Sequence, residues 1–279
     1  MMIDVLITCY NEENFIADCI ETVIAQSRFD LINLIVIVDD GSTDGSIAVV
    51  NAIAQKNNKI RHIIKQNGGL ANARNAGLAV CKSEFVAILD GDDLWEPTKI
   101  ERQVNVIKES GCDFVYSGFI RFTYNATEAP THPKRYSGSG KDIVTKLYLN
   151  GGPILPSTVL FRRELNGRIL YFDEKFKQVE DTDYWLRYLQ TGHVEFCNGA
   201  LVKHRLHSNS LSADLETKYQ CQMQLIRKIN DEIPCLRPHA NTRKKLILLK
   251  LLKRQFIKLS IFGVGKSVCR LIGVYIALY

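Results

Sequence analysis

Short apolar runs alternate with amphipathic stretches throughout the first hundred residues of this chain. The runs are rich in β-branched residues and too short for helices, whereas the stretches between them have helical length and spacing. Near-continuous apolar strands separated by helices are typical of a parallel sheet covered on both faces and linked by right-handed crossovers. We therefore expect strands at 3–9, 34–40, 60–65 and 84–90, and helices at about 13–26, 70–81 and from a cap among 42–44 to about 55.

The rest of the chain repeats this pattern less regularly. Residues 123–141 show no periodicity and are predicted to form a loop. The predicted class is α/β, with a Rossmann-like, mostly parallel sheet flanked by helices and a C-terminal helical extension. The further expected elements are a helix from Pro97 to about 110, strands at 113–119, 156–163, 193–197 and 200–206, and helices at 180–190, 212–230 and 242–260.

Charge is distributed unevenly along the 279 residues. No acidic residue follows Glu232, and ten of the 36 Lys and Arg lie beyond it, so the first 232 residues carry a net charge of −4. Such asymmetry predicts contact between the tail and a polyanionic surface. The basic residues of the tail alternate with long aliphatic ones, which disfavours nucleic acid as the partner.

The thiols and the start of the chain indicate a compartment. The eight cysteines form no CxxC pair, and the first residues lack the basic segment of a secretory signal. We therefore expect reduced thiols and a cytoplasmic protein.

Polar or glycine-rich segments follow each of the first four predicted strands. They are Thr8 to Glu12, Asp39 to Ser42, Asn67 to Gly69, and Asp90 to Asp93. The carboxyl ends of parallel strands meet at one edge of a sheet, where such folds bind ligands. Turn chemistry accounts for any one of these segments, but it does not account for three carboxylates within four positions.

The carboxylates of Asp90, Asp92 and Asp93 predict a cation site. An Asp-x-Asp pattern at a strand end directs two carboxylates into one small volume, where Mn²⁺ or Mg²⁺ can share them with diphosphate oxygens. The glycine-rich signatures of dinucleotide-binding and P-loop proteins are absent from this edge. A phosphorylated ligand of another kind is therefore expected.

The motifs in sequence order resemble the family 2 glycosyltransferases, which have the GT-A nucleotide-sugar fold. The resemblance is carried by TCYNEENFIADCIETVIAQS, VDDGSTDGS, NGGLANARNAGL, ILDGDDLWEP, PSTVLFRREL, FDEKF and EDTDYWLR. It implies transfer of a sugar, with inversion, from a nucleotide diphosphate sugar to a hydroxyl, in the synthesis of a polysaccharide, lipopolysaccharide or other cell-surface glycan. UDP is the favoured nucleotide. The implied domains are a catalytic one at 1–210, with a donor half (1–110) and an acceptor half (111–210), and a helical basic extension at 211–279.

The resemblance also implies roles for individual residues. A nucleotide site is implied at Thr8, Tyr10, Glu12, Asp39, Asp40, Arg74, Asp90 and Gly91, with Asp40 or Asp39 contacting the base. Asp92, or its neighbour Asp93, would bind the Mn²⁺ or Mg²⁺ ion, and His207 would close over the ion or the diphosphate. Asp181 would be the catalytic base.

The chemistry of inversion supports a single base. One displacement needs one carboxylate to remove the proton of the acceptor hydroxyl, because the metal takes over the role of the acid. Asp181 begins a predicted helix, whose N-terminus would stabilise the anion and lower its pKa. The alternative is that Glu180 and Asp181 only cap this helix, and Asp183 is expected on its solvated face.

The tail leaves two interpretations open. The basic amphipathic helix either lies on an anionic membrane surface, at the inner face of the cell membrane, or packs on the catalytic domain. The expected partners are a nucleotide-sugar donor and a glycan or lipid-linked acceptor. The alternative function is a catalytically silent nucleotide-sugar-binding or scaffold protein with the same fold.

Overall fold

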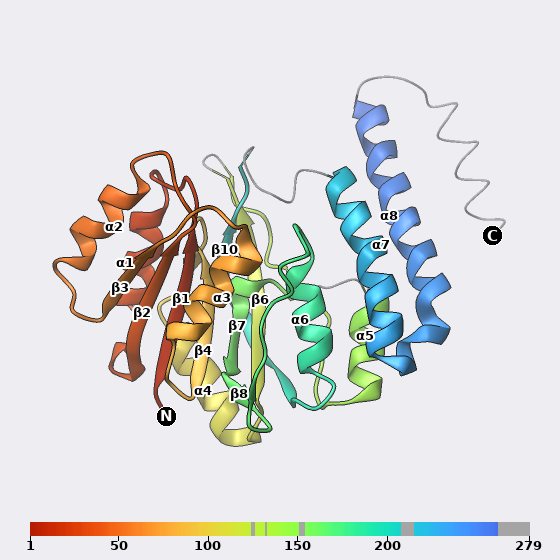
Figure 1. The fold of residues 1–279 in the computed structure, drawn as a ribbon, viewed down its shortest axis with the longest axis horizontal. Helices are drawn as coiled ribbons and strands as arrows, with labels where there is room; N and C mark the ends of the chain where they lie inside the picture. Colours follow the sequence, from red (N-terminus) through yellow and green to blue (C-terminus); the bar gives the residue numbers. More distant parts are fainter. Residues whose placement is uncertain (124–125, 132, 151–153, 208–214, 262–279) are drawn as a thin grey trace.

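The sheet of the protein has the predicted α/β arrangement. The computed structural model describes residues 1–123, 126–131, 133–150, 154–207 and 215–261. Within them, eight strands form one sheet in the order β3-β2-β1-β4-β7-β6-β10-β5 (Figure 1). The strands are β1 (Ile3–Cys9), β2 (Ile32–Asp39), β3 (Ile60–Ile64), β4 (Phe85–Asp90), β5 (Leu94–Trp95), β6 (Phe114–Phe122), β7 (Val159–Arg162) and β10 (Val194–Arg205), and a separate hairpin holds β8 (Glu164–Leu165) and β9 (Arg168–Ile169).

The sheet is mostly parallel, as predicted. β1 pairs in parallel with β2 and β4, β2 with β3, and β6 with β10. β7 runs antiparallel between β4 and β6, and the two-residue β5 is antiparallel to β10. The carboxyl ends of β1, β2 and β4 therefore lie along one edge, as the alternating pattern of the first hundred residues requires.

Helices cover both faces of this sheet. They are α1 (Ile16–Ile24), α2 (Ser46–Ala54), α3 (Leu70–Val80), α4 (Lys99–Ser110), α5 (Lys141–Asn150), α6 (Glu180–Tyr188), α7 (Leu215–Glu232) and α8 (Ala240–Ile261). Successive side chains of a strand point to opposite faces. Val5 and Ile7 of β1 accordingly join one apolar core with α1, α2 and α4, whereas Leu6 joins a second core with α3, α5, α6 and α7.

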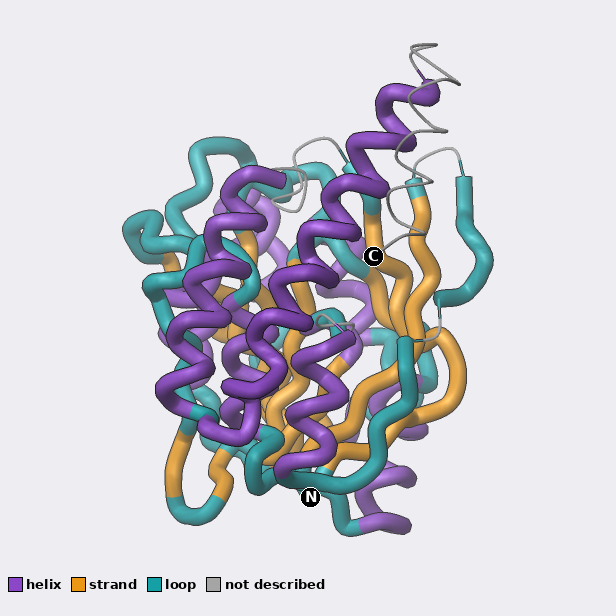
Figure 2. Tube along the Cα trace, turned by 90° about the vertical axis from the view of Figure 1, so that its right-hand side faces the viewer, coloured by secondary structure: helices purple, strands orange, loops and turns teal. Residues whose placement is uncertain are grey.

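The C-terminal helices belong to the second core. Side chains of α7 and of the 3₁₀ segment Pro234–His239 are buried against α5 and α6, among them Leu225, Ile229 and Leu236. On α8, Arg243 and Ile247 are also buried. Figure 2, viewed from this side, shows the helices lying in front of the sheet.

Two predictions of elements differ from the structure, whereas the loop predicted at 123–141 is borne out over its described residues. The two strands expected at 193–197 and 200–206 are one strand, β10, with a register shift around Gly199, whose φ of 99° only glycine adopts readily. No helix was expected at 141–150, where α5 lies; its buried residues at 143, 144, 147 and 148 have helical spacing that the preceding loop obscured. The described part of 126–140 forms isolated bridges to β6 and β10.

Candidate active site at the carboxyl edge

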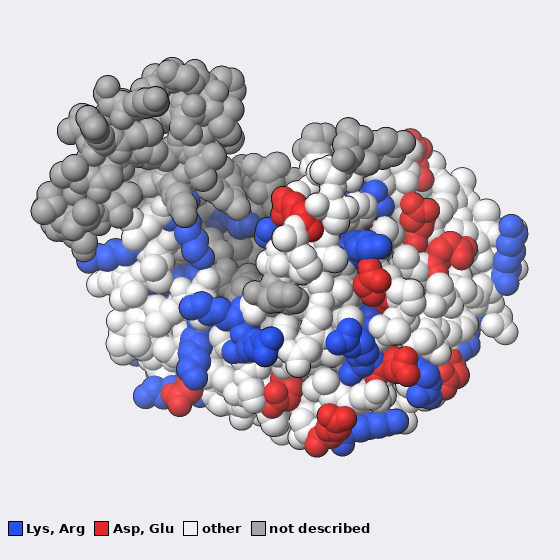
Figure 3. All heavy atoms as spheres, turned by 180° about the vertical axis from the view of Figure 1, so that it is seen from behind, with Lys and Arg blue, Asp and Glu red and all other residues white. Residues whose placement is uncertain are grey.

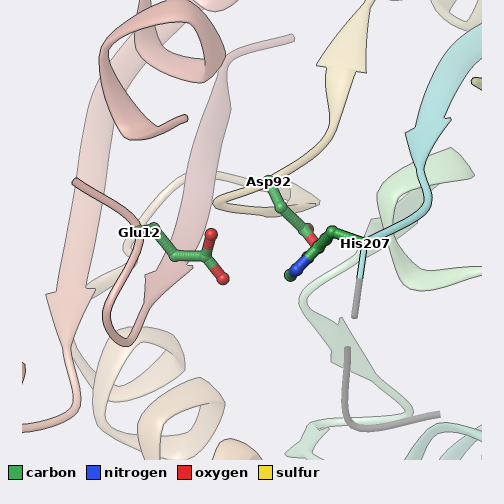
Figure 4. A group of neighbouring side chains, drawn as sticks. All are labelled: Glu12, Asp92 and His207. Carbon is green, nitrogen blue, oxygen red and sulfur yellow. The ribbon is translucent and has the colours of Figure 1, made fainter. Parts of the chain in front are cut away.

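Glu12, Asp92 and His207 meet at the carboxyl edge of the sheet. They follow β1, β4 and β10, and one ligand atom from each lies within 4.8 Å of the other two. The Nε2 atom of His207 is 2.9 Å from Oδ2 of Asp92. Figure 4 shows the three side chains pointing toward one another from separate elements. The structure therefore assembles two carboxylates and an imidazole from positions that are up to 195 residues apart, between Glu12 and His207.

The loop after β1 is held by the loop before α2. Asn11 has a φ of 55°, and its N–H donates to Oγ of Ser42 at 2.9 Å. The Glu12 N–H donates to Oγ of Ser46 at 2.8 Å, and the Oδ1 atom of Asp44 accepts the N–H of Ser46 at 3.0 Å. The cap expected among 42–44 is not observed, because the N-cap of α2 is Gly45; the side chains of Ser42 and Ser46 instead fix the backbone that carries Glu12.

The Glu12 carboxylate lies near other carboxylates among the residues that the structure describes. Its Oε2 atom is buried there without a hydrogen-bond partner. Burial, followed by repulsion from Asp92 and Asp90, raises the pKa of Glu12 to about 8. Burial, with Asp93 and Asp90, also raises the pKa of Asp92. A divalent cation would offset both effects, and oxygen ligands with one imidazole suit Mn²⁺, so the residues present fit such an ion.

Asp93, the alternative to Asp92 as a metal ligand in the sequence analysis, has hydrogen-bond partners within the protein. It is 1% exposed, and Ser157 Oγ donates to its Oδ2 at 2.6 Å. Its Oδ1 accepts the N–H of Arg205 and lies 3.0 Å from Nδ1 of His204. Because both oxygens have partners, Asp93 fixes the turn to the ends of β10 and β7, while Asp92 remains the residue that joins the cluster.

Ser157 is a residue of this site that the sequence argument missed. Its buried hydroxyl donates to Asp93 and accepts the N–H of Asp90 at 3.1 Å. One hydroxyl therefore fixes the Asp90–Asp93 turn at two points. Nothing in the local pattern around Ser157 signals this role, because its partners lie more than 60 residues earlier in the chain.

Arg74 connects the Asp90 turn to α6. It is 1% exposed, and its guanidinium lies 2.8 Å from Oδ1 of Asp90 and 2.7 Å from Oε1 of Glu180. Thr8 Oγ1 is also 3.4 Å from Asp90 Oδ1. Arg74 therefore links the carboxyl edge of the sheet to the start of α6 through two ion pairs.

Asp181 lies in the first turn of α6, directly after Glu180, which pairs with Arg74. The helix begins after Val179, which has a left-handed φ of 63°, and Oδ1 of Asp181 accepts the N–H of Thr182. The predicted lowering of the Asp181 pKa was wrong. Burial raises the pKa of Asp181, and this effect outweighs the opposing charges of Arg74 and Lys218.

Asp183 was predicted on the solvated face of its helix, and this was wrong. Its side chain is 0% exposed and forms ion pairs with Arg187 and with Lys228 of α7. The error has a simple cause: α7 covers this face of α6, and a sequence pattern cannot show which face a later helix will bury.

Asp39 and Asp40, at the carboxyl end of β2, differ in whether both oxygens of the carboxylate have hydrogen-bond partners. Asp40 accepts the N–H groups of Gly68 and Gly69, at 3.0 and 2.8 Å, and pairs with Lys65. Asp39 accepts the N–H of Ser42 through Oδ1, but its buried Oδ2 has no partner within the described residues. Of the two, Asp39 is therefore the one with a carboxylate oxygen that no described group engages.

The remaining predicted residues lie along the same edge. Tyr10 is 48% exposed, and Thr8 is buried beside Asp90. The Gly91 N–H donates to the carbonyl of Thr8 at 2.9 Å, and a Cβ atom on Gly91 would come within 2.8 Å of that oxygen. A glycine is therefore required where the turn after β4 crosses the end of β1.

Comparison with known sequences identifies related proteins. The model of the family described as Glycosyl transferase family 2 matches residues 4–170. An uncharacterized glycosyltransferase of Rickettsia typhi is 26% identical over 273 residues, which cover 92% of this chain and 77% of the relative. The putative teichuronic acid biosynthesis glycosyltransferase TuaG of Bacillus subtilis is 28% identical over 76% of this chain and 82% of its own.

Comparison with solved structures supports the fold. S. aureus TarS 1–349 in complex with UDP-GlcNAc matches 89% of this chain and 72% of its own, with a TM-score of 0.68 at 19% identity. The mannosyltransferase PcManGT of Pyrobaculum calidifontis, in complex with GDP-Man and Mn²⁺, matches 99% of this chain and 80% of its own, with a TM-score of 0.65 at 17% identity. At these identities the likeness establishes a common architecture.

Proposed function

This chain belongs to glycosyltransferase family 2, and we propose that it is a metal-dependent, inverting enzyme that uses a UDP sugar to build a cell-surface glycan. The observation that carries the proposal is the meeting of Glu12, Asp92 and His207 at the carboxyl edge, beside the pair of Arg74 and Asp90. The relative TuaG is named for teichuronic acid biosynthesis, and TarS binds UDP-GlcNAc. A catalytically silent binding protein would not need a carboxylate of raised pKa at position 181.

The donor base is proposed to contact Asp39. The uracil base of a UDP sugar offers a ring N–H, and the partnerless Oδ2 of Asp39 is an acceptor at the same edge. Asp40 would support it indirectly, because its hydrogen bonds hold the loop at Gly68 and Gly69. Thr8 and Tyr10 would flank the nucleoside, and Gly91 would let the Asp90 turn approach it.

The cation is proposed to be Mn²⁺ or Mg²⁺, held by Asp92 and His207. Glu12, predicted as part of the nucleoside pocket, offers its partnerless oxygen as a third ligand at the same point. When bound, the ion would neutralise the charge that develops on the leaving diphosphate. The Mn²⁺ in the complex of PcManGT supports this choice of metal.

Asp181 is proposed as the general base. The acceptor oxygen would bond to the anomeric carbon as the bond from that carbon to the diphosphate breaks, and the hydroxyl proton would move to Asp181. A carboxylate with a raised pKa is a stronger base, which favours this transfer. The Arg74 contact with Glu180 would hold the start of α6 against the donor.

The acceptor is proposed to be a glycan or lipid-linked molecule at a membrane surface. No helix in the described part of the chain combines the length and apolar character needed to cross a bilayer. However, α8 exposes Leu248 (51%) and Leu249 (41%) beside the exposed side chains of Lys244 and Lys245. We name these four residues the α8 outer face.

The surroundings of the α8 outer face suit an anionic membrane. Figure 1 shows the C-terminal end of α8 rising past the sheet edge that carries the site. In Figure 3, Lys and Arg predominate on the half of the surface toward the C-terminal helices, whereas Asp and Glu are interspersed with Lys and Arg on the other half. Aliphatic side chains inserted among basic ones are the combination by which peripheral helices bind anionic lipid.

Charge reversal of the α8 outer face should weaken membrane binding. The double variant Lys244→Glu, Lys245→Glu leaves the buried Arg243 and Ile247 in place, and each lysine near an anionic surface contributes about 1 kcal/mol. We expect at least ~10-fold weaker cosedimentation with vesicles rich in phosphatidylglycerol. The matched control reverses two exposed lysines elsewhere, Lys56 and Lys108. Equal binding by both double variants would reject the membrane contact.

A further inference from the structure

The start of α6 depends on a residue of the C-terminal extension. We propose that Lys228 of α7 is a positioning residue that sets the orientation of Asp181, by joining α6 to the segment that precedes it. The inference rests on the proposed role of Asp181 as base. It concerns a part of the chain beyond residue 170, where the match to the family model ends.

The ammonium group of Lys228 contacts both sides of the turn that begins α6. Its Nζ is 2.7 Å from Oδ1 of Asp183, in the first turn of the helix. It is also 2.8 Å from Oδ2 of Asp173, in the segment before the helix, and 5.4 Å from the centre of the Phe176 ring. One side chain of α7 thus links positions on either side of Asp181.

These contacts are sheltered, which gives them more effect than surface ion pairs have. The side chain of Asp183 is 0% exposed and that of Lys228 is 19% exposed. Removing Lys228 would leave the buried Oδ1 of Asp183 without this partner, while Arg187 still pairs with Oδ2, and the loss of a partner from a buried ion pair is unfavourable. Leu225, one turn earlier on α7, and Ile229, the residue after Lys228, share the core of Tyr184 and Trp185 on α6.

The turn that these contacts enclose has a strained backbone. Val179 has φ 63° and ψ 16°, a left-handed conformation that a β-branched residue adopts only when its surroundings impose it. Such a residue costs on the order of 1–3 kcal/mol. Without the link between Asp173 and Asp183, Val179 could relax, and its rotation would redirect the peptide that leads to Glu180 and Asp181.

A second residue of α7 lies close enough to act on the base. Lys218 is among the charges that lower the pKa of Asp181 against the larger effect of burial. The helix therefore approaches Asp181 near its own start and holds α6 from Lys228, ten residues later. The geometry gives α7 a role in the active site as well as in the core.

The test compares variants of Lys228 by kinetics. Purified variants are assayed for release of UDP from UDP-GlcNAc with Mn²⁺, with water as the acceptor, and for UDP affinity by calorimetry. Lys228→Met should lower kcat by about 10- to 100-fold, because a misplacement of about 1 Å at a reacting group has this effect. UDP affinity should stay within about twofold. Lys228→Arg should restore most of kcat. Arg227→Met, which changes an exposed neighbouring residue, should leave kcat unchanged.

Two results would overturn the inference. One is a folded Lys228→Met with the kcat of the parent, and the other is an equal loss of kcat and UDP affinity, which indicates general loosening. If Lys228→Met does not fold, Asp173→Asn removes one contact only, and it should lower kcat in the same direction; an unchanged kcat would reject the proposal.

The proposed function is tested separately from this inference. Asp181→Asn is assayed in parallel, and if it retains turnover, the base assignment fails whatever Lys228→Met does. If the parent protein releases no UDP, crystal structures of the parent and Lys228→Met still decide. The inference expects a displacement of the Asp181 carboxylate of about 1 Å or more in the variant, and an unmoved carboxylate contradicts it.

Discussion

Replacing Asp181 with Asn should lower kcat for sugar transfer by about 10²–10⁴-fold and leave UDP affinity unchanged. The variant keeps the size of the side chain and can still accept the N–H of Thr182. It loses only the capacity to take the proton of the acceptor hydroxyl. Turnover is measured as release of nucleoside diphosphate, and affinity by calorimetry with UDP.

The pH profile distinguishes this role from that of a helix cap. Burial raises the pKa of Asp181 above its ordinary value of 3.8, and the base is active only when deprotonated. The rate should therefore fall as the pH decreases through this raised pKa, at a higher pH than an ordinary aspartate would give. The matched control is Asp142→Asn, an exposed acid in the first turn of α5. If Asp181→Asn and this control behave alike, Asp181 is not the base.

Removing the divalent cation should lower turnover about as strongly as Asp181→Asn does. EDTA should abolish turnover, and added Mn²⁺ should restore it, because no positive side chain of the Glu12, Asp92 and His207 cluster can replace the ion at the diphosphate. Asp92→Asn should weaken Mn²⁺ binding by at least ~100-fold, since changes even to the surroundings of a metal ligand cost 10- to 100-fold.

The control for this prediction is Asp18→Asn, an exposed acid on α1 away from the cluster. Electron paramagnetic resonance of free Mn²⁺ measures the binding without any need for turnover. Full activity of the parent protein in chelator, or unchanged Mn²⁺ affinity of Asp92→Asn, would contradict the proposed metal site at Asp92.

Local pattern was enough to predict the sheet and its ligand-binding edge. β1 and β4 are mostly apolar runs that end in Thr8 to Glu12 and Asp90 to Asp93, and parallel pairing brings such ends together without further information. The family resemblance also assigned His207 to this site. His207 follows β10, and its side chain contacts Asp92. These features depend on the order of elements and on their polar ends, both of which are visible in the sequence.

What could not be predicted depends on contacts between distant segments. The solvent exposure of Asp183 was predicted wrongly because Lys228, its partner, lies 45 residues later on a helix of unknown position. The direction of the Asp181 pKa shift was predicted from its own helix, whereas burial by neighbouring segments decides it. Asp93 could not be assigned because Ser157 and His204 become its neighbours only in the fold.

Thermal unfolding with a panel of nucleotide sugars tests most directly whether this edge binds a donor and a cation together. Melting is followed with UDP, dTDP and GDP sugars, each with Mn²⁺ and with EDTA. A ligand at 100 times its Kd stabilises by about 2.7 kcal/mol, which corresponds to roughly 5–10 °C for a protein of this size. We expect such a shift with a UDP sugar and Mn²⁺, and its loss in EDTA and in Asp92→Asn. Equal Tm values across the whole panel with Mn²⁺ would contradict the account.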